Sequence, residues 1–348
     1  MARARSAGFL GIVSDARARA GATVRVLLAL LGLGLVAYLV RDAGPERVLD
    51  VLWSAGTWLP VILALEVAQI ACDVIALHSI LGSATWSEIP GPALVRSQAI
   101  AYSMMVLLPA GRAAGEVTRA TILSRSIGVP RAASASTKLQ AAYLSANGVL
   151  SIAAWAVVSA RFGPASPLAL LLLGNVVFQA LISIGLIAIL RDARLGRWLD
   201  RMRRRALGLA EETAPLDPGD RRRIPWRASI VCSLARSAQV AQYGVILHAV
   251  GGAANVRSAF VVHGIHLVGA TLGDFLPNQL GVVDGAYRAF AADVGFAGEP
   301  ARALSIAFLA RIAQLTCACA CLVVVALQRS ASSSGAESQA SSGAGGRS

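Results

Sequence analysis

The stretch LLPAGRAAGEVTRA, residues 107–120, interrupts an apolar run with a proline and then places charged side chains where membrane is expected. A second stretch, FLPNQLGVVDGAYRA, occupies residues 275–289 and repeats the same order of residue types. In both, six residues separate the proline from an acid, Glu116 or Asp284, and an Arg-Ala pair follows. This repetition predicts two related membrane halves, each of which contributes one bent element to a shared site.

The overall composition is that of an integral membrane protein. Of the 348 residues, 56% are hydrophobic and only 15% are charged, and the mean hydropathy is +0.63. The formal net charge of +13 comes largely from arginines between the apolar blocks, as the positive-inside rule expects of cytoplasmic loops. No basic surface with interleaved aromatic residues accompanies them, so no nucleic-acid partner is expected.

The apolar blocks predict an all-α polytopic membrane protein with six full transmembrane helices and two re-entrant hairpins. About 20 apolar residues are needed to cross a hydrocarbon core of roughly 30 Å. The six blocks predicted to cross are residues 26–40, 57–81, 134–160, 167–190, 229–250 and 301–327.

Two further apolar segments, 93–109 and 258–277, are predicted to enter the membrane and return on the same side. The first is short and leads into residues 112–138, whose five basic residues and one acid suit the cytoplasm. The second leads into net acidic sequence that suits the outer face. The predicted breakers of these hairpins are Pro109, Gly111, Pro277 and Gly281.

The order of spans and hairpins makes the two halves mirror images in topology. Residues 57–160 read as an out-to-in span, a cytoplasmic hairpin and an in-to-out span, and residues 229–327 read as the reverse. Inverted repeats of this kind place a transport site near the bilayer midplane. We therefore expect a transmembrane domain over residues 26–328, with both termini in the cytoplasm.

Three polar segments flank or interrupt this domain. Residues 1–25 carry five arginines against one acid and are predicted to form a basic cytoplasmic segment. Residues 191–227 hold eleven arginines and six acids, which predicts a cytoplasmic loop that sets topology or one that also binds anionic headgroups. Residues 329–348 are rich in serine, glycine and alanine and are predicted to be disordered.

Charged residues in or beside the apolar segments are the candidates for substrate binding. Ionisable groups at membrane depth are costly and usually face a cavity or a partner. Arginine stays charged and binds phosphate oxygens bidentately, whereas an acid holds a guanidinium in place or meets a headgroup amine. The acids could also be purely structural partners of the arginines. The predicted substrate-binding residues are Arg112, Glu116, Arg119, Asp284, Arg288, Arg311 and Glu66.

His263 and His266 lie three residues apart and share a helical face that leads toward Asp274. A proton relay through these residues is one interpretation, and packed or hydrogen-bonded histidines are the other. Two histidines are too few for a catalytic zinc, which takes three protein ligands, so no metal site is predicted. The sequence contains no Walker loop or hydrolase elbow, and no cofactor is expected.

At these motifs the chain resembles the flippase-like family that forms the transmembrane region of lysylphosphatidylglycerol synthases. Segment 276–285 and Arg311 also look like the family. The resemblance implies a lipid-related function in a bacterial inner membrane. Family synthases add a soluble aminoacyl-transfer domain, which is not expected here, so aminoacylation by this chain alone is not expected either. In the first stretch the likeness is carried by Pro109, Gly111, Arg112, Gly115, Glu116 and Arg119.

The leading hypothesis is a flippase-like transporter that moves an anionic or zwitterionic lipid headgroup, or a lipid-linked amphipathic molecule, across the membrane. Membrane lipids are its expected partners, and a soluble lipid-modifying enzyme is considered as a further one. Two alternatives remain open. One is an intramembrane enzyme that acts on lipid-linked phosphate or sugar through acid–base groups. The other is a non-transporting protein that recruits a soluble enzyme through residues 191–227.

Overall fold

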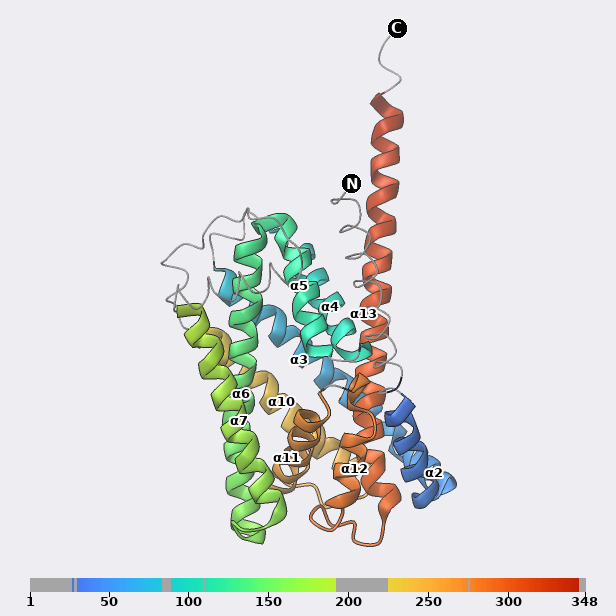
Figure 1. Ribbon diagram of the computed structural model, residues 1–348. Helices are drawn as coiled ribbons and strands as arrows, with labels where there is room; N and C mark the ends of the chain where they lie inside the picture. The colour runs from blue at the N-terminus through green and yellow to red at the C-terminus, as the bar shows by residue number, and fades with distance from the viewer. Residues whose placement is uncertain are drawn as a thin grey trace, which may run out of the picture.

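The structure is a computed structural model that describes residues 27, 30–82, 89–108, 111–191, 225–274 and 276–343. Every regular element in these ranges is a helix, which confirms the all-α prediction (Figure 1). The basic segment 1–25 and nearly all of the loop 191–227 lie outside the described residues. The elements are α2 (Pro45–Ala55), η1 (Gly56–Trp58), α3 (Leu59–Leu81), α4 (Gly91–Leu107), α5 (Gly111–Ile127), α6 (Val129–Phe162), α7 (Pro167–Arg191), α10 (Trp226–Ala249), α11 (Val256–Leu272), η3 (Pro277–Gln279), α12 (Val282–Ala289) and α13 (Pro300–Gly343).

Five helices of the described chain are long and apolar enough to cross a membrane, and they coincide with five of the six predicted spans. The remaining prediction, residues 26–40, lies partly outside the described residues, and its described part is helical from residue 30 onward. Helices of this length and composition make the chain an integral membrane protein. The five candidates are Pro45–Leu81, Val129–Phe162, Pro167–Ala188, Trp226–Ala249 and Pro300–Gln328.

The structure differs from the sequence-based expectations beside two of the spans. Residues 45–55, expected as an outer loop, form α2, which continues through η1 into α3. Pro45 suits the first turn of α2, where the missing N–H of proline removes no helical hydrogen bond. At the other end of the chain, the backbone of α13 continues beyond the predicted span and is helical to Gly343, and the disorder of residues 329–348 stays a prediction. No proline follows Pro300 to end that helix.

The first predicted hairpin is a tightly packed pair of helices, α4 and α5. Leu108 has an extended backbone (φ −103°, ψ 149°), as the steric conflict with the following proline requires. Pro109 itself lies outside the described residues. A Cβ on Gly111 would lie 1.9 Å from the carbonyl oxygen of Met105, so only glycine permits this approach. With 17 residues, α4 is about 25 Å long and shorter than the hydrocarbon core.

The second predicted hairpin consists of α11, an irregular turn and the short helix α12. Like α4, α11 has only 17 residues. The turn begins with Pro277 in η3, and Asn278 and Gln279 then adopt left-handed backbone with φ of 46° and 54°. Gly281 follows with φ of 81°, and a Cβ there would lie 2.8 Å from Leu35 Cδ2. The chain therefore reverses through several strained residues rather than through a single break.

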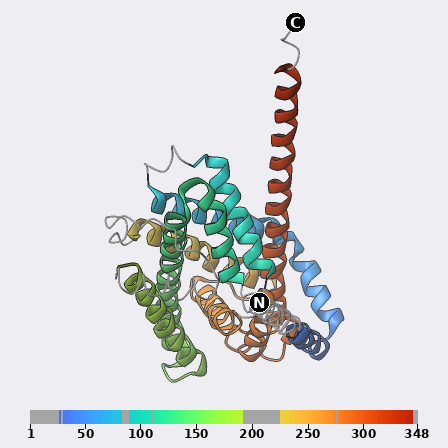
Figure 2. The same ribbon diagram turned by 45° about the horizontal axis from the view of Figure 1, so that its top comes forward.

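The two hairpins occupy opposite halves of the helix bundle. In Figure 1, α4 and α5 lie in the upper half and α11 and α12 in the lower half. Helix α3 packs along α10, and α13 packs along α4 and against α3. Helices α6 and α7 form a pair at one side of the bundle in both views (Figures 1 and 2). Since α4 also contacts η3, the end of the first hairpin meets the turn of the second.

Helix α7 shows how the bundle is adapted to lipid. Its buried face carries Asn175, Gln179 and Ser183, and its exposed face is almost entirely apolar. Polar residues inside and apolar residues outside are the arrangement expected where the surroundings are hydrocarbon. The exposed apolar side chains of α7 include Leu170, Leu171, Leu173, Val177, Phe178, Leu181 and Ile184.

Replacing Gly115 by alanine should destabilise the protein, because the new Cβ would lie 2.8 Å from the carbonyl oxygen of Ala101. Alanine improves helix propensity by about 1 kcal/mol, but overpacking costs roughly 1–3 kcal/mol, so we expect a net loss. Thermal melting of the detergent-solubilised protein measures the effect. Gly174→Ala in α7 is the matched control, since a Cβ there meets nothing within 4 Å. A melting temperature lowered no further by Gly115→Ala than by Gly174→Ala would contradict the tight packing of α4 on α5.

Candidate functional site

A polar cavity of about 120 Å³ lies where the two hairpins meet. Its wall comes from α3, α4, α5, α6, α10, α11, α13 and the turn before α12. Pockets that enclose a whole small molecule usually span ~300–1,000 Å³, so this cavity has room for part of a headgroup or a few water molecules. Its charged and amide-bearing lining residues, with one histidine, are Glu66, Gln69, Asp73, Arg112, Asn147, Arg236, Gln239, His266, Asp274, Asn278, Gln279 and Gln314.

An ion pair joins the ends of the two hairpins at this cavity. Arg112 Nε, in the first turn of α5, lies 3.8 Å from Asp274 Oδ1, just after α11. The two side chains are 30% and 43% exposed, so solvent weakens their attraction. The sequence predicts both residues for the site, and the structure brings them together.

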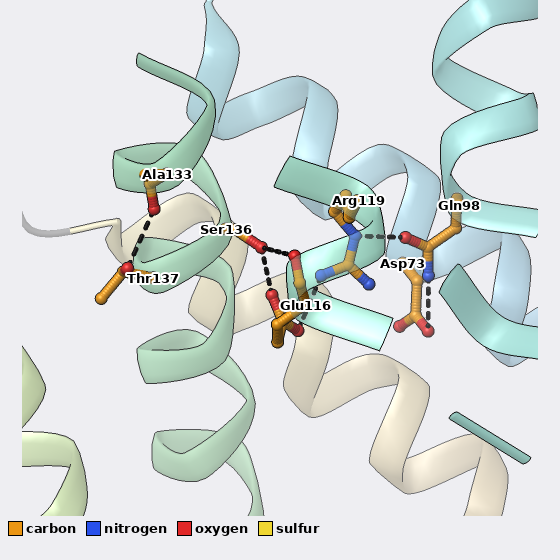
Figure 3. A network of polar contacts seen from close by, with 7 residues as sticks. All are labelled: Asp73, Gln98, Glu116, Arg119, Ala133, Ser136 and Thr137. Carbon is orange, nitrogen blue, oxygen red and sulfur yellow. Dashed lines mark hydrogen bonds and ion pairs between the residues drawn. The ribbon is translucent and has the colours of Figure 1, made fainter. Parts of the chain in front are cut away.

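Beside the cavity, a polar network links α3, α4, α5 and α6 (Figure 3). Arg119 Nη1 lies 2.7 Å from Glu116 Oε1, and Arg119 Nε donates to Gln98 Oε1 at 3.0 Å. The Gln98 amide donates in turn to Asp73 Oδ2 at 3.3 Å. Ser136 donates to the Glu116 carboxylate and to the Glu116 backbone carbonyl. Glu116 and Arg119 therefore neutralise each other, and neutral groups fix their orientation.

Glu66 is a buried carboxylate that is held by neutral donors. Tyr102 OH donates to its Oε1 at 2.6 Å, and Gln242 Nε2 donates to its Oε2 at 2.9 Å. Gln69 Nε2 supports this arrangement by donating to Gln242 Oε1 at 3.1 Å. Glu66 is 5% exposed and lines the cavity. Its position agrees with a place beside the substrate, and its role in binding stays a prediction.

Asp284 is fully buried and holds Arg311 in a bidentate pair. Arg311 Nη1 and Nη2 donate to the two carboxylate oxygens at 3.1 and 2.9 Å. Gly281 N also donates to Asp284 Oδ2, at 2.8 Å, which caps α12. Arg311 borders a void of about 10 Å³ that shares His266 and Asn278 with the main cavity. Asp284 thus has the geometry of the structural partner that the sequence left open as an alternative.

Arg288 lies outside the cavity, on the exposed side of α12. That helix buries Val283, Asp284 and Tyr287, and the next position faces outward. Arg288 Nη2 lies 3.0 Å from Asp42 Oδ2, with side chains 41% and 44% exposed. The structure therefore does not bring Arg288 to the other predicted arginines.

His263 and His266 pack on α11 against the buried ring of Tyr243. Their ring centroids lie 5.7 and 4.8 Å from that of Tyr243. His266 lines the cavity, whereas His263 is completely buried, and neither ring nitrogen of His263 has a hydrogen-bond partner among the described residues. Within the described part of the chain, no hydrogen bond joins either imidazole to Asp274 or Asp284. A relay through these groups stays a prediction and would need bridging water.

Arg236 and Gln239 of α10 line the cavity, and the sequence analysis did not single them out. Arg236 Nη1 donates to Gln239 Oε1 at 2.7 Å, and its Cζ lies 5.3 Å from the centroid of the Tyr143 ring. A signal was available, because Arg236, Gln239 and Gln242 recur every third residue in an apolar span and so lie near one another on the helix. Asn147 was missed as a single polar residue without a pattern.

The site offers guanidiniums, carboxylates and amides to one small space. Guanidiniums suit phosphate oxygens, and carboxylates suit amines or hydroxyls. Within the described ranges, no group of three or more His, Cys, Asp or Glu side chains is arranged to hold a metal ion. The arrangement can therefore bind a small group that both accepts and donates hydrogen bonds.

Replacing Asp284 by asparagine should destabilise the protein strongly, because Arg311 would keep a buried charge without a carboxylate. Removing one partner of a buried ion pair typically costs ~3–5 kcal/mol. The control Arg288→Gln breaks the exposed pair with Asp42 and should cost no more than about 1 kcal/mol. Thermal melting in detergent compares the two variants. The double variant Asp284→Asn, Arg311→Gln should regain part of the loss, and a double variant less stable than Asp284→Asn would refute the charge argument.

Comparison with known proteins places the chain in a family. No curated protein matches the chain. The family described as the lysylphosphatidylglycerol synthase TM region matches residues 23–321, which include both hairpins and every residue that lines the cavity. This integral membrane protein therefore belongs to the family of lysylphosphatidylglycerol synthase transmembrane regions.

Proposed function

We propose that the protein is a flippase-like transporter that moves the polar headgroup of an anionic or zwitterionic lipid across the membrane. The observation that carries this proposal is the cavity between the ends of the two hairpins, where Arg112 lies beside Asp274. A site closed by elements from opposite halves of a bundle can open toward either side when one half moves against the other. Membership in a family named for a lipid synthase supports a lipid as the substrate.

The physical obstacle to such transport is the headgroup. A phosphate without partners in a low-dielectric region costs several kcal/mol or more. The cavity offers Arg112 and Arg236 to a phosphate, and Glu66 and Asp73 to an amine or hydroxyl. With a volume of about 120 Å³, it admits part of a headgroup only, so the acyl chains would stay in the surrounding lipid.

We also propose that residues 57–160 and 229–327 form an inverted repeat in a bacterial inner membrane, with both termini in the cytoplasm. The opposite placement of the hairpins in the bundle supports this arrangement (Figure 1). The eleven arginines of residues 191–227 favour a cytoplasmic position for that loop. Helices α4 and α11, with 17 residues each, are both too short to cross the core upright.

Purified protein in liposomes should accelerate the exchange of a fluorescent phosphatidylglycerol between leaflets, measured by dithionite quenching from outside. Arg112→Gln, which removes a cavity charge, should slow this exchange by about tenfold or more, as loss of a charged hydrogen bond would. Arg288→Gln, outside the cavity, should keep the wild-type rate.

Two outcomes would count against transport. Exchange no faster than in protein-free vesicles would refute it directly. Mass spectrometry of the recovered lipid should find the headgroup unchanged, and a modified headgroup would instead favour an intramembrane enzyme.

A further inference from the structure

Five residues that line the main cavity each carry a buried polar atom with no hydrogen-bond partner among the described residues. Buried polar groups are nearly always satisfied, so five unsatisfied ones around a single cavity call for an explanation. Tyr143 lies near the Asp73 carboxylate, but no hydrogen bond within the described ranges reaches the five atoms themselves, so a group that enters the cavity can bind them. They are the donors Arg236 Nε and Asn278 Nδ2, the acceptors Asp73 Oδ1 and Asn147 Oδ1, and His266 Nδ1, which can do either.

The half-buried Arg236 differs from Arg119 and Arg311 in having no carboxylate in direct contact among the described residues. Arg119 is neutralised by Glu116 at 2.7 Å, and Arg311 is neutralised by Asp284 at 2.9 Å. Within the described ranges, no carboxylate oxygen lies within 4.0 Å of the Arg236 guanidinium. Asp73 attracts Arg236 only at longer range, without a direct contact, so the guanidinium can still bind an anion that enters the cavity.

Neutral groups hold Arg236 in place. Gln239 accepts a hydrogen bond from Nη1 at 2.7 Å, and the centroid of the Tyr143 ring lies 5.3 Å from Cζ, so both contacts restrict the movement of the guanidinium. Because Gln239 occupies only one N–H, the remaining donors stay free for another acceptor. An oriented but unneutralised guanidinium is well suited to bind a phosphate bidentately.

We propose that the cavity binds a phosphate ester at Arg236, with Arg112 as the second cation, and that Asp73 and Asn147 accept hydrogen bonds from the same headgroup. This assignment rests on the proposed function, since it names the class of lipid that the site would accept. A phosphodiester has only acceptor oxygens, so a headgroup that is to satisfy Asp73 Oδ1 and Asn147 Oδ1 as well must also carry a hydroxyl or an ammonium. Free phosphate shares the anionic part of this chemistry.

Calorimetric titration of the detergent-solubilised full chain tests the assignment with four probes. They are inorganic phosphate and short-chain phosphatidylglycerol, phosphatidylethanolamine and phosphatidylcholine, each lipid below its critical micelle concentration. Phosphatidylcholine has the same phosphodiester but no O–H or N–H to donate. We expect phosphatidylglycerol or phosphatidylethanolamine to bind about tenfold or more tightly than phosphatidylcholine, and Arg236→Gln to weaken that binding by about tenfold or more.

Two further variants make this result specific. Arg161→Gln removes an exposed arginine that stacks on Phe162 away from the cavity, and should leave binding unchanged. Asn147→Asp adds a carboxylate to the wall with almost no change of shape, and should weaken the binding of phosphate probes even if Arg236→Gln does not fold. Melting temperatures of all variants report whether they fold.

Three outcomes would overturn the proposal. Unchanged lipid binding by the Arg236→Gln variant would show that Arg236 does not bind the phosphate. Lack of binding of every probe by the wild type would mean that the cavity holds water only. Tight binding of inorganic phosphate, without a preference among the three lipids, would show that the cavity is a site for free phosphate rather than for a lipid headgroup.

The liposome assay separates this proposal from the proposed function. If the lipids bind as expected but do not exchange between leaflets, transport is refuted and the phosphate-binding role of Arg236 is retained. If the Arg236→Gln variant exchanges lipid at the wild-type rate, the phosphate-binding role of Arg236 is refuted and transport is retained.

Discussion

Two arginines inside the bundle, Arg119 and Arg311, are each balanced by a carboxylate, and these pairs organise much of the interior of the protein. The pair of Asp284 and Arg311 joins the short helix α12 to the long helix α13. The backbone N–H of Gly281 completes the environment of the carboxylate, so the left-handed turn before α12 is part of the same arrangement. Helix packing, turn geometry and charge balance cannot be separated here, because each places a partner that the others need.

The two proline-acid motifs have the same spacing in sequence but do not make the same contacts. Glu116 pairs with Arg119 of its own helix, three residues later. Asp284 instead pairs with Arg311 of α13, and Arg288, the arginine of its own motif, reaches outward to Asp42. Arg288 follows Asp284 in the same helix but lies on its exposed side, so the second motif takes its cation from a neighbouring helix. Similar motifs can therefore share a general architecture while the individual side chains take different roles.

The sequence predicts the spans well because hydrocarbon thickness acts on each apolar block separately. It also singles out Arg112 as a substrate-binding candidate and Asp274 as a relay candidate, and the structure places these two side chains 3.8 Å apart. Which acid neutralises which arginine depends on helix rotation and distance in space, and hydropathy contains neither. Arg236 was missed because it lies inside a span of ordinary length, and hydropathy does not show which side chains of a span face the cavity. Residues 45–55 were left between two predicted spans because they contain charged side chains, although such side chains also suit one face of the amphipathic helix α2 that the structure shows.

The glycine contacts between α4 and α5 have a mechanical consequence. Where the backbones of two helices are in direct contact, without long side chains between them, the helices cannot slide or rotate independently and move as one rigid unit. Gln98 on α4 and Arg119 on α5 are hydrogen-bonded to each other within this unit. Gln98 also donates to Asp73 on α3. A displacement of Arg112 at the start of α5 is therefore expected to shift Asp73 as well, so the positions of these two cavity-lining residues are coupled.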